Sequence, residues 1–440
     1  MSESLLDSAV SRFDEAEVYR VESESHPVLF ESNKLKEAMR RDTSGVALRV
    51  IDQGRLGFTS TTDVNRELEL VDRAAALVCF GSEALFKFPE PSHYSQVDVV
   101  DPNVPRISHR SMIDTGEGLI ERLLDEWPDL LCDVRVGWAM GSGRIMNSAG
   151  IDVSYDQTTY YCSLGAQLIR GTDMLNVWTG SSSSHFFAGE ELDRLLESVR
   201  RSIRWSKDTA KATSNSGDLP VIFTARGVGA TLLPPLLSGF NGKNVANGSS
   251  PLIEKWGTKV VDDRISIFDD PLIDGASGSR PVDDEGVASR KLALIQNGVA
   301  TAPLLDLQTA GQIGKKSTGA ASRGISSSPS PSSSVIDIST GDTNVEDMIS
   351  GVKEGLLVEE LLGAGQGNEL GGDFRANVSL GYKISDGEIV GRVKDTMISG
   401  NVYNVLSQVE KIGDSSDWVF GSMRSPAIQC LGIEVASKDD

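Results

Sequence analysis

The chain has 440 residues, enough for two or three domains that each bury a core of their own. It carries 63 Asp and Glu against 42 Lys and Arg, a formal net charge of -21, with the acidic residues spread along the chain. This balance disfavours binding to a phosphate backbone, which depends on cationic contacts and counterion release, so direct action on DNA is not expected. A spread negative charge is instead typical of a protein that resists self-association.

The four cysteines show no CxxC motif and no close pairing: Cys79, Cys132, Cys162 and Cys430. We therefore expect them to be reduced and buried, as in a cytoplasmic protein. The first residues lack the basic segment and apolar run of a signal peptide. No stretch approaches the roughly 20 apolar residues of a membrane-spanning helix, so we expect no membrane contact and a cytoplasmic location.

Residues 1–85 predict a small α+β unit. Helical spacing of apolar residues predicts a helix over 5–13, and alternation predicts one strand over 17–22 and another that ends at Phe30. Residues 46–50 and 56–59 flank Asp52-Gln53-Gly54 and predict a hairpin. Asp63 is a candidate N-cap for a helix that runs to Val78.

Residues 106–210 predict a central antiparallel sheet with helices, after a proline-punctuated connector over 89–105. A helix is predicted over 116–125, ending before Trp127-Pro128. Turns at Gly141-Ser142-Gly143 and Ser148-Ala149-Gly150 separate the first predicted strands. The predicted strands cover residues 133–140, 143–147, 152–155, 158–170 and 174–179. A charged amphipathic helix over 190–207 and a polar linker over 209–218 close this unit.

Residues 218–437 predict a β-rich domain with short strands and frequent Gly and Ser turns. It begins with a buried strand over 220–224 and a helix over 227–240. Gln296-Asn297-Gly298 lies between apolar runs and predicts a tight hairpin. The low-complexity residues 326–334 predict a mobile surface loop. The fold class predicted for the whole chain is α+β.

The acidic loop over 280–290 is the main concentration of candidate chemistry. Asp283, Asp284 and Glu285 could position a cation or a general base, because adjacent carboxylates raise one another's pKa. The alternative, which we favour, is a turn whose carboxylates cap backbone amides or pair with Arg280 and Arg290. Arg280, fixed by the proline that follows it, could clamp a peptide carboxylate or a partner's acidic loop, and a structural salt bridge is the alternative.

Other candidate chemistry is weaker. The segment Gly363-Ala364-Gly365-Gln366-Gly367 is similar to a phosphate-cradling loop, but no Lys-Ser/Thr pair follows it and no βαβ pattern contains it. No GxSxG elbow with a usable histidine is present. Cys430 lies in an apolar run, which is typical of a core position.

The acidic loop also carries a family resemblance. Residues 277–290, SGSRPVDDEGVASR, resemble the signature of the TldD/PmbA (TldE) family, a two-subunit metalloprotease system once labelled modulator of DNA gyrase. Further family-like segments lie on both sides of it, in the family's order: GVALRV at 45–50, GRLGF at 54–58, STGA at 317–320, EGLLV at 354–358, GGDF at 371–374 and GNV at 400–402. The resemblance covers nearly the whole chain. It implies an N-terminal α+β region with an antiparallel sheet and flanking helices, and a C-terminal β-rich domain of the TldD/PmbA type.

One departure from the family concerns metal. In TldD-type subunits, the helix after the first C-terminal strand carries HExxxH, in which two histidines bind a metal and the glutamate polarises a water. Here Pro234, Pro235 and Gly239 occupy those positions. All four histidines precede the linker, and none has a partner within five residues: His26, His93, His109 and His185. The resemblance therefore implies a PmbA/TldE-type subunit with no catalytic residues and no metal ligands of its own.

The implied function is that of a TldE-like subunit in a TldD–TldE heteromeric metalloprotease that degrades unfolded peptides. The metal, expected to be zinc, belongs to the TldD-type partner in this interpretation. Candidates to face the peptide or the partner are Arg280, Asp283, Asp284, Glu285 and Arg290. The alternative is a stand-alone homodimer that binds peptides, or a hydrolase with an unrecognised site.

Overall fold

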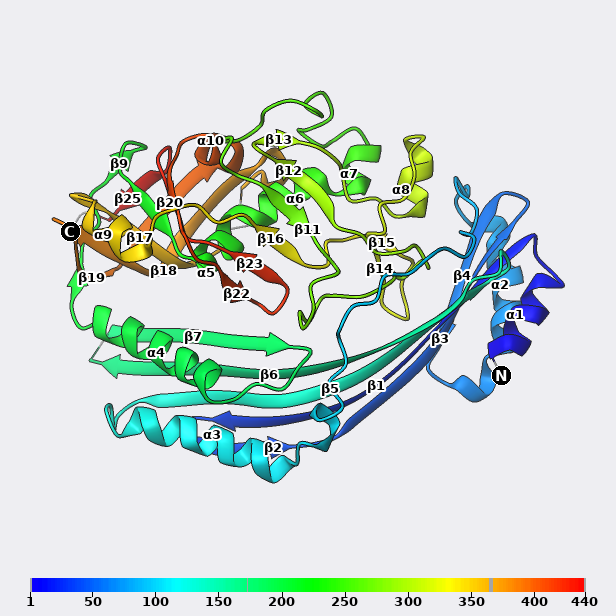
Figure 1. Cartoon of the computed structure of the whole chain (residues 1–440), viewed down its shortest axis with the longest axis horizontal. Coiled ribbons are helices and arrows are strands. Elements are labelled where there is room, and N and C mark those ends of the chain that lie inside the picture. The colour runs from blue at the N-terminus through cyan, green and yellow to red at the C-terminus, as the bar shows by residue number, and fades with distance from the viewer. Residues whose placement is uncertain (1, 172, 364–366, 439–440) are drawn as a thin grey trace.

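A long, curved antiparallel sheet forms the N-terminal half of the computed structural model, which describes residues 2–171, 173–363 and 367–438 (Figure 1). The strand order is β4-β3-β1-β5-β6-β7, and β2 pairs with β1. The strands are β1 (Glu15–Glu31), β2 (Lys34–Ala38), β3 (Arg41–Asp52), β4 (Arg55–Thr61), β5 (Leu131–Asn147), β6 (Asp152–Arg170) and β7 (Asp173–Ser183). Strands from both predicted segments, 1–85 and 106–210, thus share one sheet.

The strands are longer than the sequence patterns predicted. β1 is a single strand, and Pro27, which has no N–H, falls where pairing with β3 has ended at Ser25 and pairing with β2 starts at Val28. β5 likewise continues through Gly141-Ser142-Gly143, so the turn predicted there is wrong. Gly143 lies opposite Tyr155 in β6, and a Cβ on this glycine would lie 2.8 Å from the Tyr155 ring. This glycine makes room for a cross-strand aromatic ring and not for a chain reversal.

Helices cover one face of the sheet. Because side chains alternate along a strand, the even-numbered residues of β1 and β5 share this face. At one end, Val18 and Met146 pack with α1 (Ser2–Val10) and α2 (Glu69–Leu77). At the other end, Phe30 and Val136 pack with α3 (His109–Leu124) and α4 (Glu190–Trp205). The odd-numbered Tyr19 and Ile145 point to the opposite face, toward the C-terminal half.

Three of the four helices predicted before residue 210 have shifted starts, and α4 begins at Glu190 as predicted. α3 begins at His109, seven residues before the predicted start, because the Ser108 hydroxyl accepts the Ser111 N–H at 3.2 Å as an N-cap. Asp63 accepts the Asn65 N–H at 3.2 Å and so caps the short 3-10 helix η1 (Val64–Arg66), not α2. Two further 3-10 turns follow, η2 (Val78–Phe80) and η3 (Val104–Arg106).

The C-terminal half is β-rich, as predicted. Its larger sheet has the order β21-β24-β10-β17-β18-β20-β25-β9, and β19 joins β18 to β8. A second sheet has the order β13-β12-β11-β16-β23-β22, and β14 pairs with β15. The strands of the larger sheet are β8 (Thr209–Ala210), β9 (Asn215–Ser216), β10 (Val221–Phe223), β17 (Glu354–Leu362), β18 (Asp373–Ser385), β19 (Glu388–Val393), β20 (Thr396–Asn401), β21 (Val409–Ile412), β24 (Ile428–Cys430) and β25 (Glu434–Ser437).

The remaining strands are β11 (Ile267–Asp269), β12 (Leu292–Gln296), β13 (Val299–Ala300), β14 (Ala321–Ser322), β15 (Ser330–Pro331), β16 (Ile336–Ile338), β22 (Asp417–Val419) and β23 (Met423–Ser425). The β12–β13 hairpin is confirmed, because Asn297 and Gly298 have φ values of 49° and 76°, which a tight turn of this kind requires. β15 lies inside the segment predicted as a surface loop. Ser332 N–H there donates to the Ala320 carbonyl at 2.8 Å, so this stretch is tied to its neighbours.

The helix predicted over 227–240 is divided. α5 (Ala225–Gly227) passes into a π-helical turn (η4, Val228–Leu232) and then α6 (Leu233–Phe240). Pro234 lacks an N–H and cannot continue a regular α-helix from the preceding turn, so a wider turn accommodates it. The other helical segments are α7 (Gly242–Ala246), α8 (Leu307–Gln312), α9 (Val345–Ser350), η5 (Glu369–Gly371) and α10 (Val402–Leu406).

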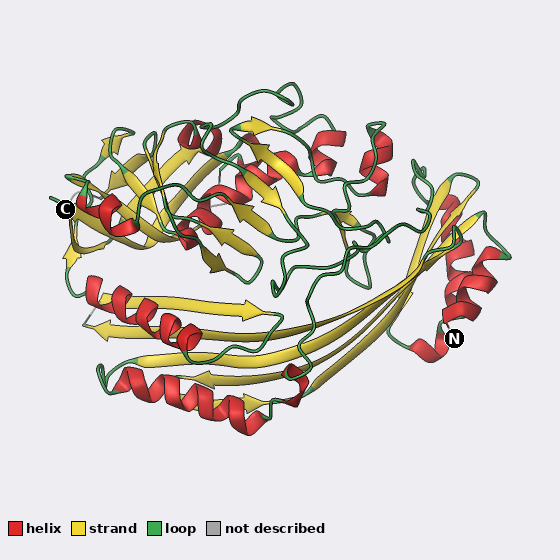
Figure 2. Ribbon diagram, in the orientation of Figure 1, coloured by secondary structure: helices red, strands yellow, loops and turns green. Residues whose placement is uncertain are grey.

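The two halves share a hydrophobic core. α4 packs on the N-terminal sheet, and the same buried cluster contains Ile222 of β10, Leu357 of β17 and Tyr382 of β18. Trp205 at the end of α4 meets Tyr382 edge-on, with ring centroids 5.2 Å apart. Figure 2 shows the long strands of the first half below the shorter strands and many loops of the second. The predicted α+β fold class is confirmed.

Two observations bear on other expectations. Cys132, Cys162 and Cys430 are free and buried, but Cys79 is free and exposed, so the expectation of burial is wrong for that residue. Among the described residues, no helix combines the length and the apolar character that a membrane crossing needs.

Two glycines of α3 provide a matched test of the packing. A Cβ on Gly116 would lie 2.3 Å from the Phe30 ring, whereas a Cβ on Gly118 would meet nothing within 4 Å. Urea unfolding should show that Gly116→Ala destabilises the chain by about 1–3 kcal/mol through overpacking. Gly118→Ala should be stabilising by about 0.5–1 kcal/mol, because alanine is the better helix former. Equal effects of the two substitutions would contradict this packing.

Candidate functional site

The acidic loop lies at the junction of the two halves. Asp283 and Glu285 are completely buried and Asp284 is 5% exposed, so the three carboxylates face protein. Gly286, with a φ of 82°, closes the turn against Ile151 of the N-terminal half. Tyr94 donates from its hydroxyl to the Gly286 carbonyl at 3.1 Å.

Asp283 organises the loop through backbone hydrogen bonds. Its Oδ1 accepts the N–H groups of Glu285 and Val287, both at 2.9 Å, and its Oδ2 accepts the Ala321 N–H at 3.0 Å. These contacts join the loop to β14. The expectation that the carboxylates cap backbone amides describes Asp283 correctly.

Glu285 belongs to a buried ionic cluster that crosses between the halves. We call Glu17, Arg49, Glu285 and Arg323 the junction cluster. Arg49 lies 2.9 Å from Glu17 and 2.5 Å from Glu285, and Arg323 lies 2.8 Å from Glu17. Glu285 Oε2 also accepts the Leu307 N–H at 2.6 Å. Two residues of the N-terminal sheet and two of the C-terminal half thus form one alternating chain of charges.

Aromatic rings enclose both guanidinium groups. Arg49 lies 5.1 Å from the Phe86 ring centroid and 5.0 Å from that of Phe88, and Arg323 lies 4.1 Å from that of Tyr19. Rings at these distances provide cation–π attraction while they exclude water. The cluster is therefore desolvated, and each of its charges depends on its partners.

Asp284 forms a second link across the junction. It lies 3.3 Å from Arg280, accepts the Tyr155 hydroxyl at 3.3 Å and accepts the Arg323 N–H at 2.9 Å. Arg280 also donates to the Ala321 carbonyl at 2.8 Å. The structural salt bridge considered for Arg280 is therefore present. Arg290 does not join it: this exposed side chain donates to the Ser317 carbonyl at 3.1 Å.

Burial and charge act in opposite directions on the two glutamates. Burial raises the pKa of Glu285, and although Arg49 opposes this shift, the neighbouring Asp283 and Asp306 add to it. Burial also acts to raise the pKa of Glu17, but the charges of Arg323 and Arg49 outweigh it and hold the pKa below its ordinary value. Glu17 is thus fixed as a carboxylate, while Glu285 is the titratable member of the cluster.

α6, where the resemblance places the metal motif, presents Pro234, Pro235 and Gly239, none of which has a metal-ligating side chain. Pro234 is exposed and Pro235 is buried in α6. At Gly239, a Cβ would lie 2.2 Å from the Tyr403 hydroxyl, so that ring occupies the space next to the helix. In the described part of the chain, no group of three or more His, Cys, Asp or Glu side chains is placed to hold a metal ion. Residues 364–366 of the Gly363–Gly367 segment lie outside the described residues.

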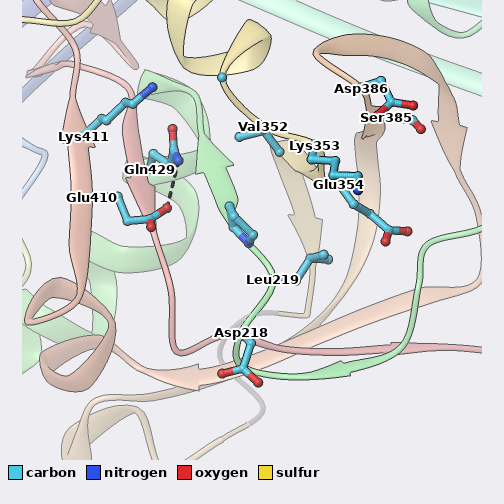
Figure 3. Close-up of a pocket in the computed structure, with 12 residues that line it drawn as sticks. Asp218, Leu219, Val352, Lys353, Glu354, Ser385, Asp386, Glu410, Lys411 and Gln429 are labelled. Carbon is cyan, nitrogen blue, oxygen red and sulfur yellow. Dashed lines mark hydrogen bonds between the residues drawn. The ribbon is translucent and has the colours of Figure 1, made fainter.

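The C-terminal half carries an open groove of about 740 Å³, lined by ends of β17, β18 and β21, by β24 and by the residues just before β10 (Figure 3). Four carboxylates and two lysines line it: Asp218, Glu354, Asp386, Glu410, Lys353 and Lys411. Figure 3 shows the carboxylates of Asp218, Glu354 and Asp386 well apart from one another. Charges that do not converge on one point do not define a site for one ion or substrate group.

A smaller cavity of about 380 Å³ lies between the two halves, beside the start of α5. β7 and α4 line it from one side, and α5, β17 and β22 from the other. Its residues include Trp178, Arg226, Glu359 and Phe420, none of which the sequence patterns singled out. It combines aromatic surface with a buried carboxyl group, as ligand sites commonly do.

Comparison with known proteins identifies the class. Residues 216–437 match the PmbA/TldA metallopeptidase C-terminal domain, and residues 16–78 match PmbA/TldA metallopeptidase domain 1. The two family models together cover the C-terminal half and the first part of the N-terminal half. The chain belongs to the TldD/PmbA family, as the sequence resemblance implied.

Two relatives each align with 95% of this chain. A protein named metalloprotease from Methanothermobacter thermautotrophicus is 26% identical over 95% of this chain and 91% of its own length. An uncharacterized protein of Methanocaldococcus jannaschii is 25% identical over 95% of both chains. Among solved structures, TldE from Thermococcus kodakarensis has a TM-score of 0.88 at 23% identity, covering 99% of this chain and 100% of that one. A putative modulator of DNA gyrase from Bacteroides thetaiotaomicron has a TM-score of 0.86 at 21% identity, covering 99% of this chain and 98% of that one. These structural likenesses establish the fold.

The junction cluster predicts a large difference between two arginines. Arg49→Met leaves two carboxylates buried without their shared cation and should lower the free energy of unfolding by about 3–5 kcal/mol. Arg290→Met removes only a surface contact and should change it by no more than about 0.5 kcal/mol. Urea unfolding monitored by circular dichroism provides the measurement. Similar values for the two variants would contradict a stabilising role for the cluster.

The cluster also predicts a pH dependence. The folded-state pKa of Glu285 is raised from 4.5 to about 7, so the folded chain keeps a proton that the unfolded chain releases. The contribution of this group to stability is therefore complete below pH 4.5 and is lost as the pH rises toward 7.

Glu285→Gln removes this titration and should make the fall in unfolding free energy between about pH 5 and 7 less steep. Part of the fall should remain, because burial also raises the pKa values of Asp283 and Asp269 to about 6. Urea unfolding at several pH values provides the measurement. Glu346→Gln in the exposed first turn of α9 is the control and should leave the slope as it is. An unchanged slope in Glu285→Gln would show that Glu285 does not carry the dependence.

Proposed function

We propose that this chain is a TldE/PmbA-type subunit of a heteromeric metalloprotease that degrades unfolded peptides in the cytoplasm. A TldD-type partner holds the metal, expected to be zinc, and this chain contributes binding surface. Membership of the TldD/PmbA family supports the proposal, as do relatives named metalloprotease and a structural neighbour named TldE.

The observation that carries the proposal is the replacement of the metal motif in α6. Pro234 and Pro235 have no donor side chain and Gly239 has none at all. The hydroxyl of Tyr403, in α10, lies where a side chain at position 239 would begin. Val402 and Leu406, also in α10, are buried in the same hydrophobic core. A histidine at position 239 would require this part of the core to be rebuilt.

The acidic loop then has a structural function in this subunit. Asp284 and Glu285 contact the N-terminal half, and Asp283 and Arg280 hold the loop that carries them. These side chains therefore act on a peptide or partner only by fixing the shape of the chain. Arg290 is exposed and remains available for direct contact. The peptide-facing surface of the subunit is therefore expected elsewhere, at an open cavity.

The proposal is tested by reconstitution. The chain is purified alone, with a TldD-type partner that carries HExxxH, and with that partner's Glu→Gln variant in the motif. Hydrolysis of unstructured peptides should require the intact partner and should stop on addition of a chelator. Metal analysis should find bound metal in the complex and none in this chain alone.

Stoichiometric metal together with chelator-sensitive hydrolysis by this chain alone would overturn the proposal and favour the hydrolase alternative. Recovery of only self-complexes from native extract, with peptide binding but no hydrolysis on addition of any TldD-type protein, would favour the homodimeric binding protein.

A further inference from the structure

The cavity between α4 and β22 presents three exposed aromatic rings. Trp178 is 40% exposed, Trp418 37% and Phe420 53%. Trp178 and Phe420 come from different halves, yet their rings are nearly parallel, with centroids 6.3 Å apart and an interplanar angle of 21°. We call this set of lining residues the aromatic cavity. Aromatic rings that line a cavity and remain accessible to solvent offer a contact surface for an apolar group of a ligand.

The turn that carries Phe420 holds its ring in place. Phe420 has a φ of 53° and Gly421 a φ of 75°, and left-handed backbone is uncommon for a bulky residue. The Gly421 carbonyl accepts the Ser277 N–H at 3.2 Å, which ties this turn to the segment that leads into the acidic loop. The ring is therefore positioned by the backbone before any ligand arrives.

Acidic and basic side chains both line the cavity: Glu191, Glu197, Glu359 and Asp417 beside Arg194, Arg201 and Arg226. Arg226 lies 2.8 Å from Glu360 and 4.9 Å from the Trp178 ring centroid. Arg194 lies 2.9 Å from Glu191. A cationic ligand would meet repulsion from these arginines, and an anionic ligand would meet repulsion from the nearby carboxylates. Neither charge sign is favoured, so the ligand group that enters is expected to be uncharged.

Glu359 supplies one unsatisfied polar atom in the wall of the cavity. Its residue is 5% exposed, and Oε2 accepts the Ser202 hydroxyl at 3.3 Å. Oε1 has no hydrogen-bond partner among the described residues, and Arg201 Nη2 is 3.8 Å away from it. Burial raises the pKa of Glu359, which Arg201 and Arg226 partly oppose. A buried oxygen without a donor is costly, so a ligand N–H at this position would be stabilising.

We propose that the aromatic cavity binds an unfolded peptide by taking an apolar, preferably aromatic, side chain against Trp178 and Phe420, while a peptide N–H donates to Glu359. The inference rests on the proposed function and deepens it, because it gives this subunit a peptide preference of its own. A cavity of about 380 Å³ is large enough for one side chain and its backbone, not for a folded domain.

The test measures binding to the full chain alone, so that catalysis by a partner plays no part. Fluorescence anisotropy follows three labelled, flexible peptides that differ only in one central residue, Phe, Ala or Lys. The Phe peptide should bind about tenfold more tightly than the Ala peptide, as expected for one buried aromatic side chain. The Lys peptide should bind no better than the Ala peptide.

Variants then locate the preference. Phe420→Ala and Trp178→Ala should reduce the Phe-to-Ala affinity ratio to below about threefold, because each removes one wall of the cavity. Phe80→Ala is the matched control, since Phe80 is 84% exposed and does not line the cavity, so the ratio should be unchanged. Glu359→Met should weaken the Phe and Ala peptides by the same factor and preserve their ratio. Thermal unfolding checks that each variant is folded.

Equal affinity for the Phe and Ala peptides, tighter binding of the Lys peptide, or an intact ratio in Phe420→Ala would each overturn the inference. So would variants that abolish assembly with a TldD-type partner while peptide binding is unchanged, because the cavity would then be a subunit contact. If the chain prefers the Phe peptide but no hydrolysis appears when a TldD-type partner is added, the proposed function is overturned and the assignment of the cavity is not.

Discussion

The desolvated charges between the two halves are the interaction on which the rest of the structure depends. Glu17 and Arg49 lie on paired strands of the N-terminal sheet, while Glu285 and Arg323 belong to loops of the C-terminal half. A pair of hydrophobic surfaces can slide, but alternating buried charges are satisfied in one register only. The cluster therefore restricts how the halves meet at the acidic loop, while the apolar cluster around α4 joins them beside the cavity between α4 and β22.

Much of the fold was predictable because local patterns dominate it. The Asn297-Gly298 hairpin, the alternating strands of the N-terminal half and the amphipathic α4 follow from turn chemistry and periodicity. Strand lengths were not predictable, because glycine has two opposite uses. Gly150 has a φ of 99° and reverses the chain, whereas Gly143 makes room for a ring on the next strand. The second use depends on which residues face each other across neighbouring strands, and a short stretch of sequence does not show this pairing.

The acidic loop illustrates what sequence reasoning could and could not find. Its capping and salt-bridge character was correctly favoured, but Glu17 looked like the solvent side of a half-buried strand. Arg49 gave a signal, since it is a lone charge within the apolar run VALRVI, and such a residue requires a buried partner. The cavity residues Trp178 and Phe420 lie more than 200 residues apart, so only the folded chain brings them together.

The insertion of Ile222, Leu357 and Tyr382 into the cluster around α4 has a consequence for the separate halves. Either half alone would expose to water an apolar surface that is buried against the other half in the whole chain. A gene that encoded only one half would therefore produce a chain that is prone to aggregate.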